Sequence, residues 1–196
     1  SSGSTANFSI AQYQKHKNKE RNIVVVPAVT WATSVSPWII NGFKVKYLDI
    51  NLNDFSINLD HLEEYLEKNH KQDNWLLQLE CFDPHEPFHA PPRFREMYPT
   101  NYDGPILDWP FYKRVNESPD EIAEMRANYA ALTTMCDEYF GKLIDHFDRY
   151  NMWADTALIL TTDHGFMLEE HEWWGKNRMP FFNEIAHIPL IIHHPD

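Results

Sequence analysis

The sequence predicts an α/β fold, in which a layered and largely parallel sheet carries helices on both faces. Segments with the apolar, β-branched character of strands alternate along the chain with segments of helical periodicity. With 196 residues, 43% of them hydrophobic, the chain is long enough to bury a substantial core. We therefore expect one domain of ordinary size, or a large part of one.

The N-terminal region is expected to contribute two strands. Residues 1–21 are predicted to be poorly ordered or helical, so that the α/β domain comprises residues 22–196. Residues 22–29 are β-branched and strand-like, although Pro27 limits them to a short strand or a sheet edge. Residues 43–47 alternate apolar and basic side chains, as a half-exposed strand does.

A helix and a buried strand are predicted next. Asn58 can cap a helix that runs to about residue 70 with three leucines on one face. Residues 75–82 are apolar enough for a buried strand, which would make Cys81 a small core residue, as Cys136 would be on a helix. Because the two cysteines form no CxxC pair, a zinc knuckle and a disulfide framework are excluded.

The longest helix is predicted to begin at Ser118. This residue is the expected N-cap, Pro119 suits the first turn, and Glu121 completes a capping box. Apolar residues then recur at spacings of three and four as far as Phe147, which keeps one stripe buried. Gly141 inside this helix costs about 1 kcal/mol relative to alanine, so we expect it to mark a close backbone approach.

Two strands, at residues 156–161 and 188–192, complete the alternation. The proline-rich stretch after Phe82 is predicted to be an irregular loop, and residues 93–117 a long ordered excursion. The net charge of −12 argues against a nucleic-acid or anionic-membrane partner, because both require a basic face. No apolar run is long enough for a membrane segment, and no signal-peptide pattern is visible at the N-terminus.

Ionisable residues concentrate in the loops that follow Phe82 and Thr162. In layered α/β sheets, ligands bind in the crevice outside the carboxyl ends of the strands, and both loops leave such an end. They are also the two segments densest in histidine and carboxylate. This coincidence predicts an active site formed by the two loops.

The second loop contains a possible cation site. Asp163 and His164 can both turn onto one ion, and Gly165 lets the chain swing away afterwards. Oxygen with one imidazole suits calcium, magnesium or manganese better than a structural zinc. An Asx-turn at Asp163 beside a buried His164 explains the same residues, and the tripeptide alone favours this simpler interpretation.

The first loop presents His85 between Pro84 and Glu86-Pro87, which stiffen the backbone around it. Such a histidine can donate to an anionic ester or protonate a leaving oxygen, although an ordinary loop histidine fits equally well. Lys176 can neutralise charge on a tetrahedral anion, although a surface lysine is the commoner explanation. Trp173 and Trp174 are expected to pack in the core or at the rim.

Together these segments resemble a known family. "DTALILTTDHGFMLEEHEWWGKN" and "FFNEIAHIPLIIHHP" resemble the late signature of the type I sulfatases, in the alkaline phosphatase superfamily. "FDPHEPFHAPPRF" resembles the family's P-H-x-P-F-x-A-P segment, and "NYAALTTMCDEYFGKLIDHFD" its long helix. The match spans roughly residues 59–195 with the motifs in order. It implies a partial alkaline-phosphatase-like α/β domain and a metal-dependent sulfuric ester hydrolase.

The resemblance implies a role for each matching residue. Asp163 and His164 would be two ligands of a divalent cation, usually Ca²⁺, with Mn²⁺ or Mg²⁺ as alternatives. His85 and Lys176 would be catalytic and hydrogen-bond the sulfate and its bridging oxygen, while His171 would bind substrate at the pocket wall. The expected partner is a sulfated small molecule or glycan, and the expected location is periplasmic, secreted or lysosome-like.

The sequence departs from the family in three respects. Glu169 stands where the family has glycine, and His187 where many members have Arg or Asn. The C/S-x-P-S-R segment, in which the family forms its formylglycine nucleophile, does not occur, and residues 1–57 match poorly. We therefore expect an internal or late fragment of the catalytic domain that is inactive alone, with the formylglycine in an N-terminal part that precedes it.

Two other functions fit the same residues. A phosphonate monoester or phosphodiester hydrolase of the superfamily shares the Asp-His pair, and would be distinguished by manganese or iron and by a preference for phosphoryl esters. A non-catalytic remnant that binds sulfated glycan would be distinguished by the lack of an upstream C-x-P-S-R.

Overall fold

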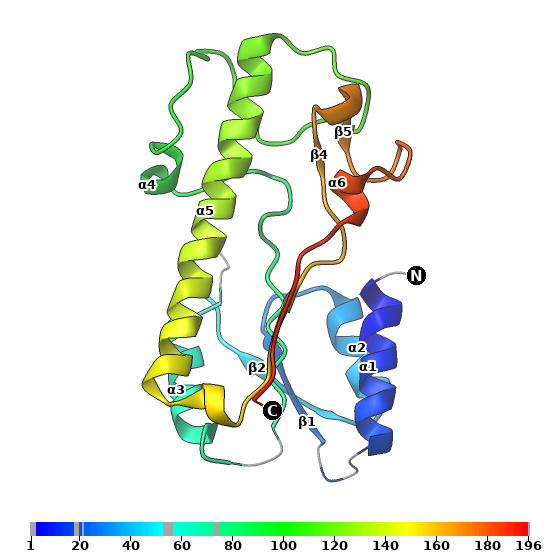
Figure 1. The fold of residues 1–196 in the computed structure, drawn as a ribbon, viewed down its shortest axis with the longest axis vertical. Helices are drawn as coiled ribbons and strands as arrows, with labels where there is room; N and C mark the ends of the chain where they lie inside the picture. The colour runs from blue at the N-terminus through cyan, green and yellow to red at the C-terminus, as the bar shows by residue number, and fades with distance from the viewer. Residues whose placement is uncertain (1–2, 18–19, 21, 53–56, 73–74, 196) are drawn as a thin grey trace. The chain divides into compact units, whose positions relative to one another are not determined.

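The computed structural model describes residues 3–17, 20, 22–52, 57–72 and 75–195 (Figure 1). They fall into two compact units, Ser1–Phe82 and Asp83–Asp196. Both units combine helices with strands, which confirms the predicted α/β class. Helix α1 (Gly3–Lys17) occupies most of residues 1–21, while the domain boundary expected at residue 22 stays a prediction.

The first unit is built around a parallel pair of strands. After α1 come β1 (Ile23–Pro27), α2 (Ala32–Ile40), β2 (Lys44–Leu48) and α3 (Leu59–Asn69). β1 and β2 pair from Ile23↔Lys44 to Pro27↔Leu48, and Val25 also bridges Leu77 in parallel. Pro27 is the last residue of β1. A proline has no N–H to donate, and at the end of a strand this leaves the hydrogen bonds of the earlier residues intact.

A small core joins these elements. Ala11 of α1, Val24 and Val26 of β1, and Trp38 of α2 are buried together with Phe43. The rings of Trp38 and Phe43 meet edge to face with centroids 5.1 Å apart. The predicted helix cap is confirmed, because the Asn58 side chain accepts a hydrogen bond from the His61 amide at 3.1 Å.

The strand predicted at residues 75–82 is wrong. Within its length only Leu77 makes a β-bridge, and Cys81 is exposed rather than a core residue. The polar side chains of this segment contact helices: Gln78 donates to Asn7 of α1 at 3.3 Å, and Glu80 accepts from Ser34 of α2. An apolar composition does not supply the backbone ladder that defines a strand.

The second unit contains short helices, a long helix and antiparallel pairs. Its elements are α4 (Pro92–Arg95), α5 (Pro119–Arg149), the 3₁₀ helices η1 (Met152–Ala154) and η2 (Glu170–Glu172), β3 (Leu158–Thr161), β4 (Met167–Leu168), β5 (Trp174–Gly175), α6 (Asn183–Ala186) and β6 (Leu190–His193). β3 pairs with β6 and β4 with β5, both antiparallel. Among the described strands, parallel pairing therefore occurs only in the first unit. The predicted largely parallel sheet does not extend into the second unit.

Strands β4 and β5 lie with α6 beside the N-terminal half of α5 (Figure 1). Arg126 of α5 donates to the Leu168 carbonyl of β4 at 2.9 Å, which fixes this arrangement. Among the described residues, none of the helices has both the length and the apolar character needed to cross a membrane.

Helix α5 begins as predicted. The Glu121 amide donates to the Ser118 hydroxyl at 3.4 Å, and the Glu121 carboxylate accepts from the Ser118 amide at 2.7 Å, so both halves of the capping box are present. Of the predicted stripe, Met125, Leu132 and Phe147 are buried. The other members, Ile122, Tyr129, Cys136, Tyr139 and Leu143, are half-buried.

Gly141 does not mark a close approach. A Cβ atom at this position would meet no heavy atom within 4 Å, and the residue is exposed. The expectation was wrong because glycine in a helix has no required packing partner, only a backbone that is more costly to order.

Two ion pairs hold α4 against α5. Arg93 forks onto Glu138 at 2.6 and 2.9 Å, and these hydrogen bonds lower the pKa of Glu138 to about 2. Arg95 lies 2.6 Å from Glu124. Burial acts to raise the pKa of Glu124, but the hydrogen bonds from Arg95 and Thr100 outweigh it and the pKa falls below the ordinary 4.5.

Gly141→Ala is expected to raise the free energy of unfolding by about 0.5–1 kcal/mol, because alanine loses less backbone entropy in an exposed helix interior. Urea denaturation followed by circular dichroism measures the change. Thr133→Ala, at another exposed position of α5, is the control for a gain in helix propensity, and it also removes the hydroxyl that donates to the Tyr129 carbonyl at 3.0 Å. A destabilised Gly141→Ala protein would show that a side chain at this position meets a neighbour.

Acid is expected to weaken the contacts between α4 and α5. Glu124 and Glu138 have folded-state pKa values below 4.5, so their contribution is complete above that pH and declines as the pH falls through the folded values, to about 2 for Glu138. The unfolding temperature of Glu138→Gln should therefore lie below that of the parent at pH 5, and the difference should shrink toward pH 2. A difference that stays constant over this interval would contradict the assignment.

Candidate functional site

The loop after the first unit is anchored by Phe88. This ring is buried and meets Tyr129 of α5 and Phe166 edge to face, with centroids 5.2 and 5.4 Å apart. The Phe88 amide also donates to the Asp108 carbonyl at 2.6 Å. His85, three residues earlier, is therefore attached to a fixed point of the core.

His85 and Lys176 lie together, as the two-loop site requires. Lys176 follows β5, and its Nζ atom is 2.5 Å from Nε2 of His85 although the residues are 91 positions apart. Nδ1 of His85 lies 2.7 Å from the Glu86 carbonyl oxygen, which can only accept, so Nδ1 carries the ring proton. Nε2 then offers its lone pair to the Lys176 ammonium.

Glu86 completes this cluster, and the sequence did not point to it. Its side chain is only 2% exposed, and its Oε1 and Oε2 atoms lie 3.3 and 3.4 Å from Nζ of Lys176. Tyr112 donates its hydroxyl proton to the same carboxylate, and Nδ1 of His85 is 3.4 Å from Oε2. Its neighbours in the sequence, His85 and Pro87, are both half-buried, and neither residue type predicts that the carboxylate between them is buried.

The wall around Lys176 is aromatic. Nζ lies 6.0 Å from the ring centroids of both Tyr112 and Phe166, which themselves meet edge to face. Trp174 of β5 is fully buried and donates its indole proton to Glu117 at 2.9 Å. Burial acts to raise the pKa of Glu117, but hydrogen bonds from the backbone, Lys113 and Trp174 outweigh it and the pKa is lowered.

Asp163 and His164 occupy a turn after β3, where a carboxylate and an imidazole lie close together. Nε2 of His164 is 3.7 Å from Oδ2 of Asp163, and Nδ1 is 2.9 Å from the Gly165 carbonyl oxygen. With its proton on Nδ1, the ring presents an unprotonated Nε2 beside a carboxylate oxygen, which is the form that metal-binding histidines take. The side chains are 63% and 38% exposed, so His164 is not the buried histidine of the simpler alternative.

This pair does not make a whole metal site. No cluster of three or more His, Cys, Asp or Glu side chains that could hold an ion occurs within residues 3–17, 20, 22–52, 57–72 and 75–195. Two donors fit a cation only as part of a larger ligand set, since calcium takes six to eight oxygen ligands.

Gly165 fixes the turn in place. Its amide donates to the Ile185 carbonyl at 2.9 Å, and a Cβ atom would come within 1.8 Å of the Glu184 carbonyl oxygen. No other residue fits at this contact between the turn and α6. Phe166, the next residue, packs on Phe88, so the turn is tied to the same aromatic cluster as His85.

His171 lies apart from the Lys176 cluster in its contacts. Its ring stacks on Phe182 with centroids 4.0 Å apart, and Nε2 is 3.4 Å from Oε1 of Glu184. The residue is exposed and has a left-handed backbone, with φ of 52°. Its role in substrate binding stays a prediction.

Glu169, the departure from the family pattern, has a structural explanation. Its φ is 85°, in the left-handed region that glycine adopts without strain, which accounts for the glycine usual there. Oε2 of Glu169 lies 2.7 Å from Arg126 of α5, so the side chain has an ion-pair partner.

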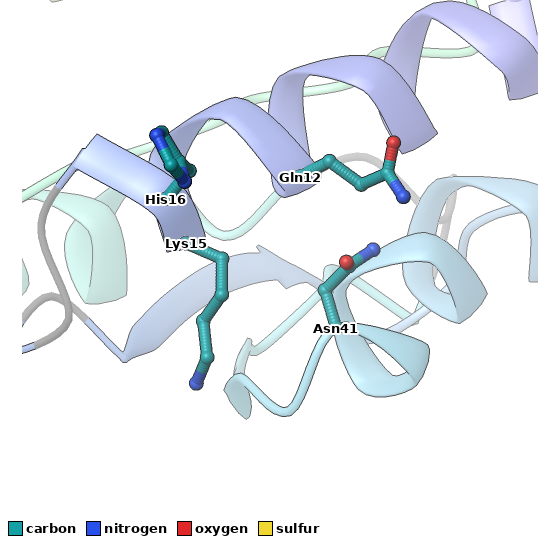
Figure 2. A pocket seen from close by; sticks show the side chains of 4 residues that line it. All are labelled: Gln12, Lys15, His16 and Asn41. Atoms are coloured by element: carbon teal, nitrogen blue, oxygen red, sulfur yellow. The ribbon is translucent and has the colours of Figure 1, made fainter.

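A separate shallow depression of about 430 Å³ lies in the first unit. Figure 2 shows the side chains that line it, Gln12, Lys15 and His16 from α1 and Asn41 from the end of α2. It contains none of the predicted site residues. The candidate site is therefore identified by its side chains and their contacts, and not by this depression.

Comparison with known proteins places the chain in a family. A sequence model described as Sulfatase matches residues 10–196. Choline-sulfatase of Rhizobium meliloti (strain 1021) is 30% identical over 138 residues, which cover 62% of this chain and 27% of that protein. The multifunctional alkaline phosphatase superfamily protein PehA of Trinickia caryophylli is 28% identical over 146 residues, covering 60% and 28%. The chain thus spans little more than a quarter of the length of these relatives.

One relative is not described as a sulfatase or as a member of the alkaline phosphatase superfamily. GDP-4-keto-6-deoxy-D-mannose 3-dehydratase of Escherichia coli O55:H7 (strain CB9615 / EPEC) is 37% identical over 68 residues, which cover 33% of this chain and 18% of that protein. Every candidate site residue lies in the Asp83–Asp196 unit, whose motifs are those of sulfatases.

A solved structure supports the fold. The crystal structure of yidJ, a sulfatase candidate from Bacteroides fragilis, aligns with a TM-score of 0.53 and 25% identity, covering 68% of this chain and 29% of that one. The α/β class, the match over residues 10–196 and the motif order agree, so the fold is of the alkaline phosphatase type. The chain belongs to the sulfatase family.

Proposed function

We propose that the full-length protein containing this chain hydrolyses a sulfate ester, and that the Asp83–Asp196 unit supplies one half of its active site. The observation that carries the proposal is the 2.5 Å contact between Lys176 Nζ and His85 Nε2. Two polar residues 91 positions apart are in contact beside aromatic rings. A charged group in such surroundings costs desolvation free energy, so it is expected to have a functional role or a partner of opposite charge. The choline-sulfatase relative supports a sulfated small molecule as substrate, and a sulfated glycan is the other expected class.

In the proposed reaction, Lys176 is the proton donor to the leaving oxygen. Its ammonium binds an oxygen of the sulfate group, and as the S–O bond breaks it donates a proton to the departing alkoxide. Nε2 of His85 has its lone pair toward Nζ, so this imidazole acts as the acceptor that orients the donor. The proposal thus assigns proton donation to Lys176 and orientation of that donor to His85.

Asp163 and His164 would hold a divalent cation through Oδ2 and Nε2. Calcium is the expected ion, with manganese or magnesium as alternatives, because a carboxylate and one imidazole accept all three. When bound, the ion would compensate the negative charge of the sulfate. The exposed positions of both side chains leave room for ligands from other segments.

The attacking nucleophile lies outside this chain in the proposed enzyme. The family forms formylglycine in a C/S-x-P-S-R segment, and the 196 residues contain none. The chain is therefore proposed to be inactive alone.

A second candidate is a phosphonate monoester or phosphodiester hydrolase. The similarity to PehA, a multifunctional protein of the alkaline phosphatase superfamily, favours it, because Lys176 and His85 would serve a phosphoryl group in the same way. A non-catalytic protein that binds sulfated glycan is the third. Parallel assays with sulfate and phosphate esters of 4-nitrophenol separate these three outcomes.

Manganese is expected to bind at Asp163 and His164 even in the 196-residue chain, with an affinity of about millimolar because only part of the ligand set is present. Paramagnetic Mn²⁺ should broaden the NMR signals of the His164 ring before those of the exposed His89. Asp163→Ala should abolish this preference. Equal broadening of both histidines in the unmodified chain would argue against a cation site.

Lys176→Ala in the full-length protein is expected to lower kcat/KM for 4-nitrophenyl sulfate about 100- to 1,000-fold, since it removes a charge-stabilising donor. Lys142→Ala, an exposed lysine on α5, is the matched control and should retain the parent activity. The 196-residue chain should release no 4-nitrophenol. Hydrolysis by this chain, removed by Lys176→Ala, would contradict the external nucleophile.

A further inference from the structure

We propose that Glu86 is a positioning residue, which holds the Lys176 ammonium against Nε2 of His85 and leaves one N–H of the lysine for the substrate. This inference rests on the proposed function, because it concerns the same site. It assigns a task to a residue that the motif comparison passes over.

Burial shows that the Glu86 carboxylate is not a surface charge. The side chain is 2% exposed, and that of its partner Lys176 is 12% exposed. A buried charge is costly unless it is paired and hydrogen-bonded, and each of these residues supplies the partner of the other. Tyr112 supplies a further hydrogen bond to Oε1 of Glu86, which anchors the carboxylate.

The distances restrict the orientation of the ammonium group. Nζ lies 3.3 and 3.4 Å from the two carboxylate oxygens of Glu86, and 2.5 Å from His85 Nε2. A lysine has three N–H donors, of which one faces Nε2 and one the carboxylate. The third is therefore directed by the other two rather than by free rotation about the Cε–Nζ bond.

Glu86 also acts on His85. Its backbone carbonyl accepts from Nδ1 at 2.7 Å, and its Oε2 atom lies 3.4 Å from the same nitrogen. Both groups favour a proton on Nδ1, which keeps Nε2 as the acceptor for Lys176. One residue thus sets the tautomer of the histidine and the direction of the lysine.

Packing alone does not explain a carboxylate at this position. The surroundings are the rings of Tyr112 and Phe166, near which an apolar side chain of similar size would avoid the desolvation of two charges. The positioning of a catalytic proton donor explains why a buried Glu86–Lys176 ion pair is present despite its desolvation cost. Small displacements of such a donor reduce the reaction rate strongly.

The first test uses NMR on the 196-residue chain and needs no activity. Long-range ¹H–¹⁵N spectra should show Nε2 of His85 as the unprotonated nitrogen. Glu86→Gln keeps the backbone carbonyl at Nδ1 but removes the carboxylate that holds the Lys176 ammonium at Nε2, so the two ring nitrogens should move toward the averaged values of exchanging tautomers, while the exposed His89 stays unchanged. Glu86→Asp, which keeps the charge, should retain more of the parent pattern than Glu86→Gln. An unaltered His85 pattern in folded Glu86→Gln would overturn the proposal.

The second test uses the full-length protein and 4-nitrophenyl sulfate. Glu86→Gln should lower kcat about 10- to 100-fold with a smaller change in KM, as expected when donor alignment is lost and binding persists. The order of kcat should be parent, Glu86→Asp, then Glu86→Gln, and Glu138→Gln on α5 should match the parent. An unchanged kcat in Glu86→Gln would overturn the proposal even if the parent is a sulfatase.

Tyr112→Phe tests the same positioning with a smaller change to the cluster. If Glu86→Gln fails to fold, Tyr112→Phe removes only the hydroxyl that donates to Glu86, and the same NMR shift and a smaller loss of kcat would support the proposal. Their absence in folded Tyr112→Phe would overturn it. If the parent hydrolyses no sulfate ester, the proposed function fails, while the His85 spectra alone decide whether Glu86 positions the pair.

Discussion

The candidate site depends on one buried ion pair, that between Glu86 and Lys176. Neither charge can remain in its aromatic surroundings without the other, because an unpaired buried charge costs several kcal/mol even after relaxation. The pair joins a loop at residue 86 to a strand end at residue 176, and so brings His85 to Nζ of the lysine. Tyr112 and Phe166 then pack around the contact, and the remaining geometry follows from it.

A second constraint acts on the backbone rather than on charge. The Asp163-His164 turn reaches α6 only because Gly165 has no Cβ to collide with the Glu184 carbonyl oxygen. Four residues later, Glu169 adopts a left-handed conformation that glycine would adopt without strain, and its carboxylate pairs with Arg126 of α5. The departure at Glu169 therefore concerns backbone conformation and lies outside the groups proposed to contact substrate.

The sequence predicts those features that depend on local chemistry or on motif order. The cap at Asn58 and the capping box at Ser118 are confirmed, and His85 and Lys176, which the motifs single out separately, lie in contact. It fails where the outcome depends on distant partners. Residues 75–82 have the composition of a strand without the neighbours that complete a ladder, and Glu86 is indistinguishable from a solvated glutamate until Tyr112 and Lys176 surround it.

Charge balance shows what the proposed site requires from elsewhere. The positive charge of Lys176 is already matched by Glu86, and Asp163 adds a negative charge on a chain whose net charge is −12. These residues alone would repel a sulfate ester. Glu86 already neutralises the positive charge of Lys176, and the carboxylate of Asp163 leaves the group with a net negative charge. A divalent cation at Asp163 and His164 would reverse the sign of the local potential, so the proposed metal would serve substrate capture as well as reaction. Lys176, held by Glu86, is then left to act on the leaving oxygen rather than to attract the anion.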